Sequence, residues 1–562
     1  MRWWWVVVVL LVPLGGYVLV RTVWWRAVEI ARPLSVPDDD HEVAWLHTST
    51  SGESWEDFVW GLKRAEMPGS GAPAGLHVDD SAAFPDRTTE IPEVVVSRDG
   101  YAGSLRFRWY KVTNYAPAHA WVKALAERGR APLAIIGGWS SDRARELAEA
   151  MRDQPWPGEK PLFLIATATA DSVYPDEDNY DAGYKEPPRL IGLYDRSFRF
   201  CFTNHQMAEA VSDFVLTDPA LRPGPAVLPG LRAVPGAVGG GWAALAWLSE
   251  LNLQAPGVAP LPDVRAASPG LPAFAVAWKD DPYSLDLCQQ FREVLAARGA
   301  RPGYPRVAIE STALPFSAGR YSRPNPYEAQ VVDHILANLP RRGERTLVVL
   351  PAVTAPARRV LSSLSQGNPS VARRLVAITG DGIPVNALFR DGEFAWPVRA
   401  IPIPLVLFTH TDPLDWDEPG EHVPPHGYAL HPPAKPSDVK NSTEDIRLFT
   451  LIGAVLARGA FPDPPSGSES AEPAPRRLVS GPDALADAFR ALDPPFFDPT
   501  GNRLAGSGEF VVVLRPTPRV DGVVTYPDAI LDAYTRGAGE WTHRHSRPIV
   551  QTLRPSDGGG GE

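Results

Sequence analysis

The sequence predicts an α/β protein of two lobes, each a parallel sheet flanked by helices, behind an N-terminal transmembrane helix. Short, wholly apolar strands alternate with segments whose apolar residues recur at helical spacing, which is typical of a parallel sheet covered on both faces. This pattern occurs twice, before and after a Pro- and Gly-rich stretch at 217–272. With 562 residues the chain is also too long for one compact core.

The strands of the two predicted lobes follow from their composition and their flanking turns. In the first lobe they are 43–47, 105–112, 133–136, 162–165 and 198–202; in the second they are 274–278, 307–311, 346–350, 375–379 and 404–408. Helical periodicity between them is clear, for example at Ala144, Leu147 and Met151. We expect the helices to cover the sheets.

The composition shifts along the chain predict its organisation. The expected segments are a transmembrane signal-anchor at 1–26, a linker at 27–40, the first lobe at 41–216, an insertion at 217–272, the second lobe at 273–440, a helix near the lobe crossover at 441–459, a disordered linker at 460–480, a segment completing the lobes at 481–554, and a disordered tail at 555–562. Residues 68–100 are expected to form a further insertion within the first lobe.

The N-terminal segment is long enough to cross a bilayer. Trp3 to Val20 carries no charge, and roughly 20 apolar residues span the hydrocarbon core. Tryptophans at both ends resemble interfacial aromatic belts. A cleaved signal peptide is the alternative, but Ala27 and Ala31 do not form a good cleavage frame. We therefore expect a single-pass anchor in the cell membrane. By the positive-inside rule its flanking charges, Arg2 on one side and Arg21 and Arg26 on the other, favour an inward-facing body. The expectation of a body in the periplasm or outside the cell comes instead from the resemblance described below.

Charge and cysteine content exclude several classes of function. The net charge of −11 is spread along the chain, and no basic stripe offers a nucleic-acid surface. The two cysteines, Cys201 and Cys288, have no metal-binding spacing and lie in apolar runs, so we expect two buried thiols, although a disulfide stays open. Nothing in the sequence indicates a cofactor.

Small hydroxyl residues follow several strands of the first lobe. The sharpest turn is Ile135-Ile-Gly-Gly-Trp-Ser-Ser-Asp142, where a serine either contacts a ligand or only caps its own helix. Similar turns at 48–51 and 166–171 are predicted to open at the same sheet edge, where helix N-termini favour anionic groups. The candidate ligand-binding residues of this lobe are Ser49, Thr50, Trp139, Ser140, Ser141 and Thr169.

The order of these segments resembles the type I periplasmic-binding proteins, which include the leucine/isoleucine/valine-binding components of ABC transporters. The stretches that carry the resemblance are Pro132–Ser141, Pro161–Ala170, Phe198–Met207, Ala273–Tyr283, Phe291–Gly299 and Phe497–Arg503. The first turn departs from the family's usual Pro-Leu-Ser/Thr-Gly form and reads His47-Thr-Ser-Thr-Ser-Gly52.

The resemblance implies a small polar ligand, such as an amino acid or amide, held in a cleft between two lobes that close by hinge motion. Hydroxyls of the first lobe then hold the ligand's carboxylate, at Ser140 or Ser141 and Thr169. Tyr283 is implied as the aromatic residue that closes over the ligand, and Asp381 as the acceptor of its ammonium group. An ABC permease or a signalling partner is implied as well.

Two other classes of function remain open. The sequence shows no motif of an enzyme: no Gly-x-Ser-x-Gly elbow, no P-loop and no His-Glu-x-x-His. A group of acidic and histidine residues raises the possibility of a metal site, but its proline-rich context predicts solvated loop residues instead: His410, Asp412, Asp415, Asp417, His422, His426 and His431, with the same interpretation for His543 and His545. The alternative to a receptor is a non-binding envelope scaffold built on the same fold.

Overall fold

The computed structural model divides the chain into two compact units, and each is described here by itself. Unit 1 draws its residues from Met1–Val173, Pro188–Phe202 and Asp445–Leu504, and unit 2 from Tyr174–Pro187, Thr203–Glu444 and Ala505–Glu562. The structure describes residues 31–173, 187–225, 270–301, 304–317, 324–340, 344–366, 369–389, 396–413, 443–462, 476–505, 508–517, 528–537 and 539–549.

Unit 1 is a mixed sheet with strand order β2-β3-β5-β1-β6-β7-β8. Its strands are β1 (His41–Thr48), β2 (Leu76–Asp79), β3 (Glu93–Arg98), β5 (Leu105–Val112), β6 (Ala134–Gly137), β7 (Leu162–Ile165) and β8 (Ser197–Arg199). Its helices are α2 (Gly52–Ala65), α3 (Ala118–Glu127), α4 (Ser141–Asp153), the 3-10 turn η1 (Leu190–Gly192), α14 (Thr443–Ala460) and α15 (Pro482–Arg490), and β4 (Tyr101–Ala102) pairs with β15 (Arg476–Arg477).

Alternate residues of β1 face opposite layers of unit 1. Val43 and Trp45 pack in a core with α2, α14 and α15, whereas Ala44 and Leu46 pack in a second core with α3 and α4. All four side chains are 1% exposed or less. This explains why β1 is apolar without alternation, as strands covered on both faces are.

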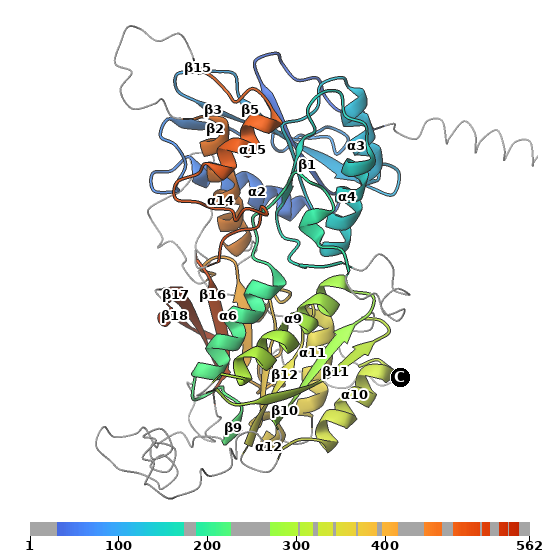
Figure 1. Ribbon diagram of the computed structural model, residues 1–562, viewed down its shortest axis with the longest axis vertical. Helices are drawn as coiled ribbons and strands as arrows, with labels where there is room; N and C mark the ends of the chain where they lie inside the picture. Colours follow the sequence, from blue (N-terminus) through green and yellow to red (C-terminus); the bar gives the residue numbers. More distant parts are fainter. Residues whose placement is uncertain are drawn as a thin grey trace, which may run out of the picture. The chain divides into compact units, whose positions relative to one another are not determined.

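Unit 2 repeats this arrangement with the strand order β11-β10-β12-β13-β14-β16-β17-β18, and β9 (Gly224–Pro225) pairs with β12. The strands are β10 (Leu271–Trp278), β11 (Val307–Leu314), β12 (Glu344–Val349), β13 (Leu375–Ile378), β14 (Leu405–Thr409), β16 (Phe510–Pro516), β17 (Ala529–Gly537) and β18 (Glu540–Ile549). Its helices are α6 (Asn204–Thr217), α9 (Pro282–Gly299), α10 (Pro326–Ala337), α11 (Thr354–Ser365), α12 (Pro369–Ala372) and α13 (Asn386–Phe389). Figure 1 shows α6 and α9 side by side, and the two helices pack against each other.

The two-lobed α/β architecture that the sequence predicts is confirmed, but neither sheet is purely parallel. In each unit the five parallel strands have the doubly wound order 2-1-3-4-5: β5-β1-β6-β7-β8 in unit 1 and β11-β10-β12-β13-β14 in unit 2. Unit 1 adds the antiparallel strands β2 and β3 beyond β5, and unit 2 adds β16, β17 and β18 beyond β14. The stretch 68–100, expected as an insertion, therefore supplies two strands of the sheet.

Several expectations fall wholly or largely outside the described residues. They include the N-terminal anchor, most of the insertion at 217–272, the middle of the linker at 460–480 and the C-terminal tail. Within the described part of the chain, no helix combines the length and the apolar character needed to cross a membrane. The helix expected at 441–459 is α14, and both cysteines are buried free thiols.

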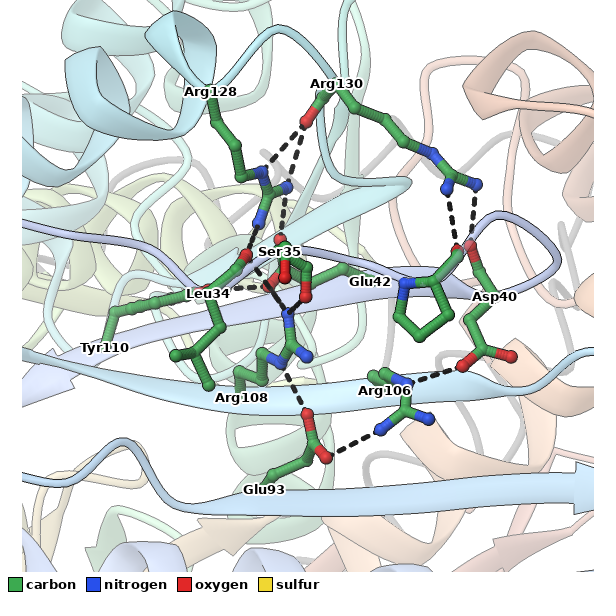
Figure 2. A network of polar contacts seen from close by, with 11 residues as sticks. Leu34, Ser35, Asp40, Glu42, Glu93, Arg106, Arg108, Tyr110, Arg128 and Arg130 are labelled. Carbon is green, nitrogen blue, oxygen red and sulfur yellow. Dashed lines mark hydrogen bonds and ion pairs between the residues drawn. The ribbon is translucent and has the colours of Figure 1, made fainter.

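A buried ionic network closes the amino end of unit 1 (Figure 2). Glu42, on β1, is buried; it accepts hydrogen bonds from Arg108 at 3.0 Å and from the Tyr110 hydroxyl at 2.6 Å, and it forms an ion pair with Arg128 at 2.6 Å. Glu93, on β3, bridges Arg108 at 2.5 Å and Arg106 at 2.7 Å. Burial and the adjacent Glu42 carboxylate raise the pKa of the Tyr110 phenol.

Arg108 and Arg128, together with Arg130, also hold the segment that precedes β1. Arg128 donates to the carbonyl of Leu34 at 2.7 Å, and Arg108 to the carbonyl of Ser35 at 3.1 Å. Arg130 donates to the carbonyls of Pro37 at 2.8 Å and Asp40 at 2.7 Å. The linker of 31–40 is thus attached to the amino ends of β1 and β5 through its backbone.

We expect Glu42→Ala to lower the free energy of unfolding by about 3–5 kcal/mol, because it leaves buried arginines without their shared carboxylate. Urea titration of the full-length protein, followed by tryptophan fluorescence, measures this loss. Lys123→Ala is the control, since it removes only an exposed pair with Glu127 and should change stability by about 0.5 kcal/mol or less. A loss within about 1 kcal/mol for Glu42→Ala would show that the network is not needed for folding.

Candidate functional site

The strand order gives each sheet a switch point, where two neighbouring parallel strands are followed by connections that run in opposite directions. In unit 1 the chain leaves β1 toward β5 and later returns to β6 on its other side; in unit 2 the strands β10, β11 and β12 repeat this. Helices that follow such neighbouring strands turn in opposite directions and leave space beyond the strand ends. The turns after β1 and β6, and after β10 and β12, are therefore the positions to search for ligand contacts.

The turn after β6 has a fixed shape. Gly138 has a φ of +75°, and a Cβ there would lie 2.6 Å from the Cβ of Ala144. Only glycine fits both constraints. This turn places Trp139 and Ser140 directly before α4. The local sequence therefore fixes the backbone positions from which both side chains extend.

At the start of α4, some hydrogen-bonding groups are not used by side-chain caps or by other contacts among the described residues. Ser140 occupies the N-cap position, yet its side chain makes no capping hydrogen bond. Ser141 is buried, and its Oγ accepts from the backbone N–H of Ala170 at 3.3 Å. Thr169, in the same turn after β7, is 1% exposed, and its hydroxyl has no hydrogen-bond partner among the described residues. Ser140, Ser141 and the 168–170 turn therefore gather at one helix N-terminus.

An aromatic stack stands beside this helix start. The ring of His47, near the end of β1, lies 4.6 Å from the ring of Trp139 and 4.8 Å from that of Trp45. The indole N–H of Trp109 donates to the carbonyl of His47 at 3.3 Å. Burial lowers the pKa of His47 to about 4, and a hydrogen bond with the Thr48 backbone only partly opposes this. The imidazole is therefore neutral at pH 7.

In the turn after β1, several side-chain hydroxyl groups hydrogen-bond to one another. Thr48 Oγ1 and Ser51 Oγ are 2.5 Å apart, and Thr50 donates to Thr48 at 3.4 Å. Ser49 and Thr50 are exposed, and neither caps α2, whose N-cap residue is Ser51. The candidate residues Ser49 and Thr50 thus lie at the expected edge, one turn from His47.

The carboxyl edge of unit 2 brings three side chains together. Tyr283, in the first turn of α9, accepts from the backbone N–H of Gly382 at 3.0 Å and is hydrogen-bonded to Asp381. Asp381 accepts from His410 Nε2 at 2.7 Å. Burial, and then the Asp381 carboxylate, raise the pKa of the Tyr283 phenol well above its usual value. Residues from α9, from the turn after β13 and from the end of β14 thus form one polar cluster.

Glycines on both sides of Asp381 make this contact possible. A Cβ on Gly380 would lie 2.7 Å from the Tyr283 hydroxyl, and one on Gly382 would lie 2.8 Å from the carbonyl of Ala352. The sequence Gly380-Asp-Gly382 therefore packs directly against the tyrosine. Asp381 retains acceptor capacity, because a carboxylate accepts about four hydrogen bonds.

The sequence interpretation of the histidine-rich segment needs correction. His410 and Asp412 are not solvated loop residues: they are 4% and 6% exposed, and each is paired, His410 with Asp381 and Asp412 with His545. His545 lies on β18 and pairs with Asp412 at 2.9 Å, and His543 lies on the same strand. The remaining members, Asp415, Asp417, His422, His426 and His431, lie outside the described residues.

Sequence reasoning missed His47 and His410 as site residues. In the sequence, His410 belongs to a group of acidic and histidine residues whose proline-rich context indicates a loop. The signal for His47 was its position at the end of an apolar strand. In the described part of the chain, no group of three or more His, Cys, Asp or Glu residues could hold a metal ion.

A serine, a histidine and an aspartate meet on β17 and β18, but not as a catalytic triad. Ser546 donates to Asp532 at 2.6 Å, while His543 Nε2 lies 3.0 Å from Ser546 Oγ and 3.6 Å from Asp532. In a triad the histidine contacts the serine and the aspartate through opposite ring nitrogens. Here one nitrogen is near both, so the contacts hold the hairpin in shape.

Comparison with known proteins gives similarity at the level of structure only. No protein-family model matches the sequence, and no curated protein matches it. A leucine-binding protein from Thermotoga maritima is similar, with a TM-score of 0.42, 11% identity, and 91% of this chain and 99% of that chain covered. An ABC-transporter solute-binding protein from R. palustris in complex with 4-hydroxybenzoate has a TM-score of 0.43, 11% identity, and coverage of 91% and 98%.

A solute-binding protein from Bacillus halodurans with bound myo-inositol is also similar, with a TM-score of 0.32, 10% identity, and coverage of 80% and 98%. Because every one of these TM-scores is below 0.5, the assignment of the fold rests on the strand order of this chain itself.

We expect the stability of unit 1 to fall as the pH drops from 6.5 to 4. The folded pKa of His47 is about 4 and its ordinary value is 6.5, so the unfolded chain binds more protons within this window. The full stability is present above pH 6.5, and roughly 3 kcal/mol is lost by pH 4. Urea titrations at several pH values measure this slope.

His47→Phe should remove this part of the pH dependence while keeping a ring in the stack. His77→Gln is the control for the loss of an imidazole outside the stack, because His77 is 58% exposed on β2. Identical pH slopes for the wild type and His47→Phe would contradict a neutral, buried His47.

Proposed function

We propose that this protein is an extracytoplasmic receptor that binds a small polar ligand at the carboxyl edges of its two α/β units. The observation that carries the proposal is the cluster of Tyr283, Asp381 and His410. These residues are far apart in the sequence, yet they meet at the edge where doubly wound sheets bind ligands. Structural contacts alone do not require a tyrosine, an aspartate and a histidine to converge there.

The carboxyl edge of unit 1 supports binding of an anionic group. The first turn of α4 offers backbone N–H groups, and Ser140 leaves them without a side-chain cap. The buried hydroxyl of Thr169 supplies a further donor without a partner among the described residues. Backbone N–H groups and a helix N-terminus favour a carboxylate.

The carboxyl edge of unit 2 supports binding of a cationic or amide group. Asp381 has acceptor capacity beyond its contacts with Tyr283 and His410. An amino acid carries a group suited to each edge: its carboxylate to that of unit 1, and its ammonium group to that of unit 2. We propose that the receptor delivers this ligand to an ABC permease, the role that the family resemblance implies, with a signalling partner as the alternative.

We expect a ligand from a panel of amino acids and small amides to raise the melting temperature of the full-length protein in detergent, by preferential binding to the folded state. A ligand at 100 times its Kd stabilises by about 2.7 kcal/mol. Differential scanning fluorimetry provides the measurement. If no compound shifts the melting temperature of a folded sample, the non-binding scaffold becomes the better interpretation.

For a ligand found this way, Thr169→Val and Asp381→Asn should each abolish the shift. Asp528→Asn is the matched control, because Asp528 is another carboxylate in an ion pair, with Arg399 at 2.6 Å, but lies directly before β17. It should keep the full response. A wild-type response in both site variants would contradict the assignment.

We also propose that residues 1–26 anchor the protein in the membrane without cleavage. The uncharged run of Trp3 to Val20 supports this. The full-length protein should stay in the membrane fraction after an alkaline carbonate wash and keep the mass of the uncleaved chain. A double variant, Leu10→Arg with Leu11→Arg, should release it. A soluble, shortened wild-type protein would establish cleavage instead.

A further inference from the structure

The aromatic stack of unit 1 reaches from the core to the surface at the predicted binding edge. Trp45 is 1% exposed and lies in the core, His47 lies above it, and Trp139 covers His47 and is partly exposed. The interplanar angles are 32° and 36°, so neighbouring rings are tilted against each other. The partly exposed ring of Trp139 is therefore in contact with His47, which in turn contacts the buried Trp45.

This stack is held from three directions. Trp109 fixes the backbone of His47 through its indole N–H, and Gly138 fixes the turn that carries Trp139. Trp45 itself packs 5.3 Å from Phe58 in a nearly parallel arrangement. A rigid aromatic surface at an exposed turn loses little conformational freedom when a ligand covers it.

The stack carries no charge at neutral pH, because burial holds the pKa of His47 at about 4. A neutral aromatic surface attracts another aromatic ring by offset or edge contacts, which add to the burial of area. Polar groups lie close to this aromatic surface. Ser140 directly follows Trp139 in the chain, and the buried Thr169 hydroxyl lies in the turn that contacts Ser141. Anion donors and an aromatic platform thus adjoin each other.

We propose that unit 1 selects ligands in which a planar, unsaturated ring carries a carboxylate, that is, aromatic carboxylates. The ring stacks on Trp139, and the carboxylate accepts from Ser140, Thr169 and the first N–H groups of α4. This inference rests on the proposed receptor function and names the substrate class of the same edge. Tyr115, which follows β5 and is 77% exposed, adds a second aromatic residue at this edge.

Two ligands of matched charge and size test this proposal. Benzoate and cyclohexanecarboxylate differ in the π face but not in the carboxylate, and the saturated ring is at least as hydrophobic. Titration calorimetry with the full-length protein should show benzoate bound about 2- to 10-fold more tightly, the range that aromatic contacts supply. Leucine is included as an aliphatic amino acid.

Variants of the platform separate stacking from general burial. Trp139→Leu should remove the preference for benzoate while both acids still bind, and Trp139→Phe should retain most of it. Trp156→Leu is the control, because Trp156 follows the far end of α4, where it donates to the carbonyl of Met151. It should leave the preference intact.

Equal affinities for the two acids, or a preference that survives Trp139→Leu, would overturn the inference. If leucine or an amide binds and neither ring acid does, the receptor function stands and the aromatic selectivity fails. If nothing binds to the folded protein, the proposed function fails together with the inference.

Discussion

The burial of Glu42 is the constraint on which the rest of unit 1 depends. A carboxylate without solvent needs several donors, and Glu42 obtains them from Arg108, Arg128 and Tyr110. These residues come from β5 and from the C-terminal end of α3, so satisfying one charge fixes the positions of two elements around β1. Arg108 also contacts Glu93 of β3, which extends the constraint to the antiparallel edge.

The network also determines which end of the sheet is available for binding. It attaches the 31–40 linker to the amino ends of β1 and β5, so the chain enters at that edge. β1 pairs with β5 over its whole length, from His41 with Leu105 to Thr48 with Val112. A strand of this length separates its ends by about 25 Å. The aromatic stack at His47 therefore lies at the edge opposite the linker.

The fold was predictable from the sequence because buried parallel strands have a strong signal. Strands such as β6 and β7 are covered on both faces, so every residue is apolar. β2 and β18 gave no such signal: they are edge strands with mostly exposed or partly exposed side chains, and His543 and His545 of β18 resemble loop residues by composition. Such strands are defined by their partners rather than by their own residues.

The candidate site was predictable only in part, for a different reason. Hydroxyl residues and glycines after strands indicate the expected binding edge, which is how Ser140 and Thr169 became candidates, whereas Asp381 was implied by the family resemblance. Their partners depend on tertiary contacts: His410 joins Asp381 across a sequence gap of 29 residues, and His47 becomes a neutral ring only because Trp45 and Trp139 enclose it. Neither contact can be predicted from the spacing of residues along the sequence.

The two units share a strand order, yet the helices that begin at their carboxyl edges are capped differently. In unit 2 the Asp281 carboxylate caps α9 by accepting from the N–H of Tyr283, which places a negative charge at the positive helix end. In unit 1 the uncharged Ser140 precedes α4 and makes no side-chain capping hydrogen bond, and the acidic residue of that helix end, Asp142, lies within the first turn. The proposed function assigns each edge its own kind of ligand group for this reason: a hydrogen-donating group beside Asp381 in unit 2, and a hydrogen-accepting group beside the uncapped N–H groups of α4 and the Thr169 hydroxyl in unit 1.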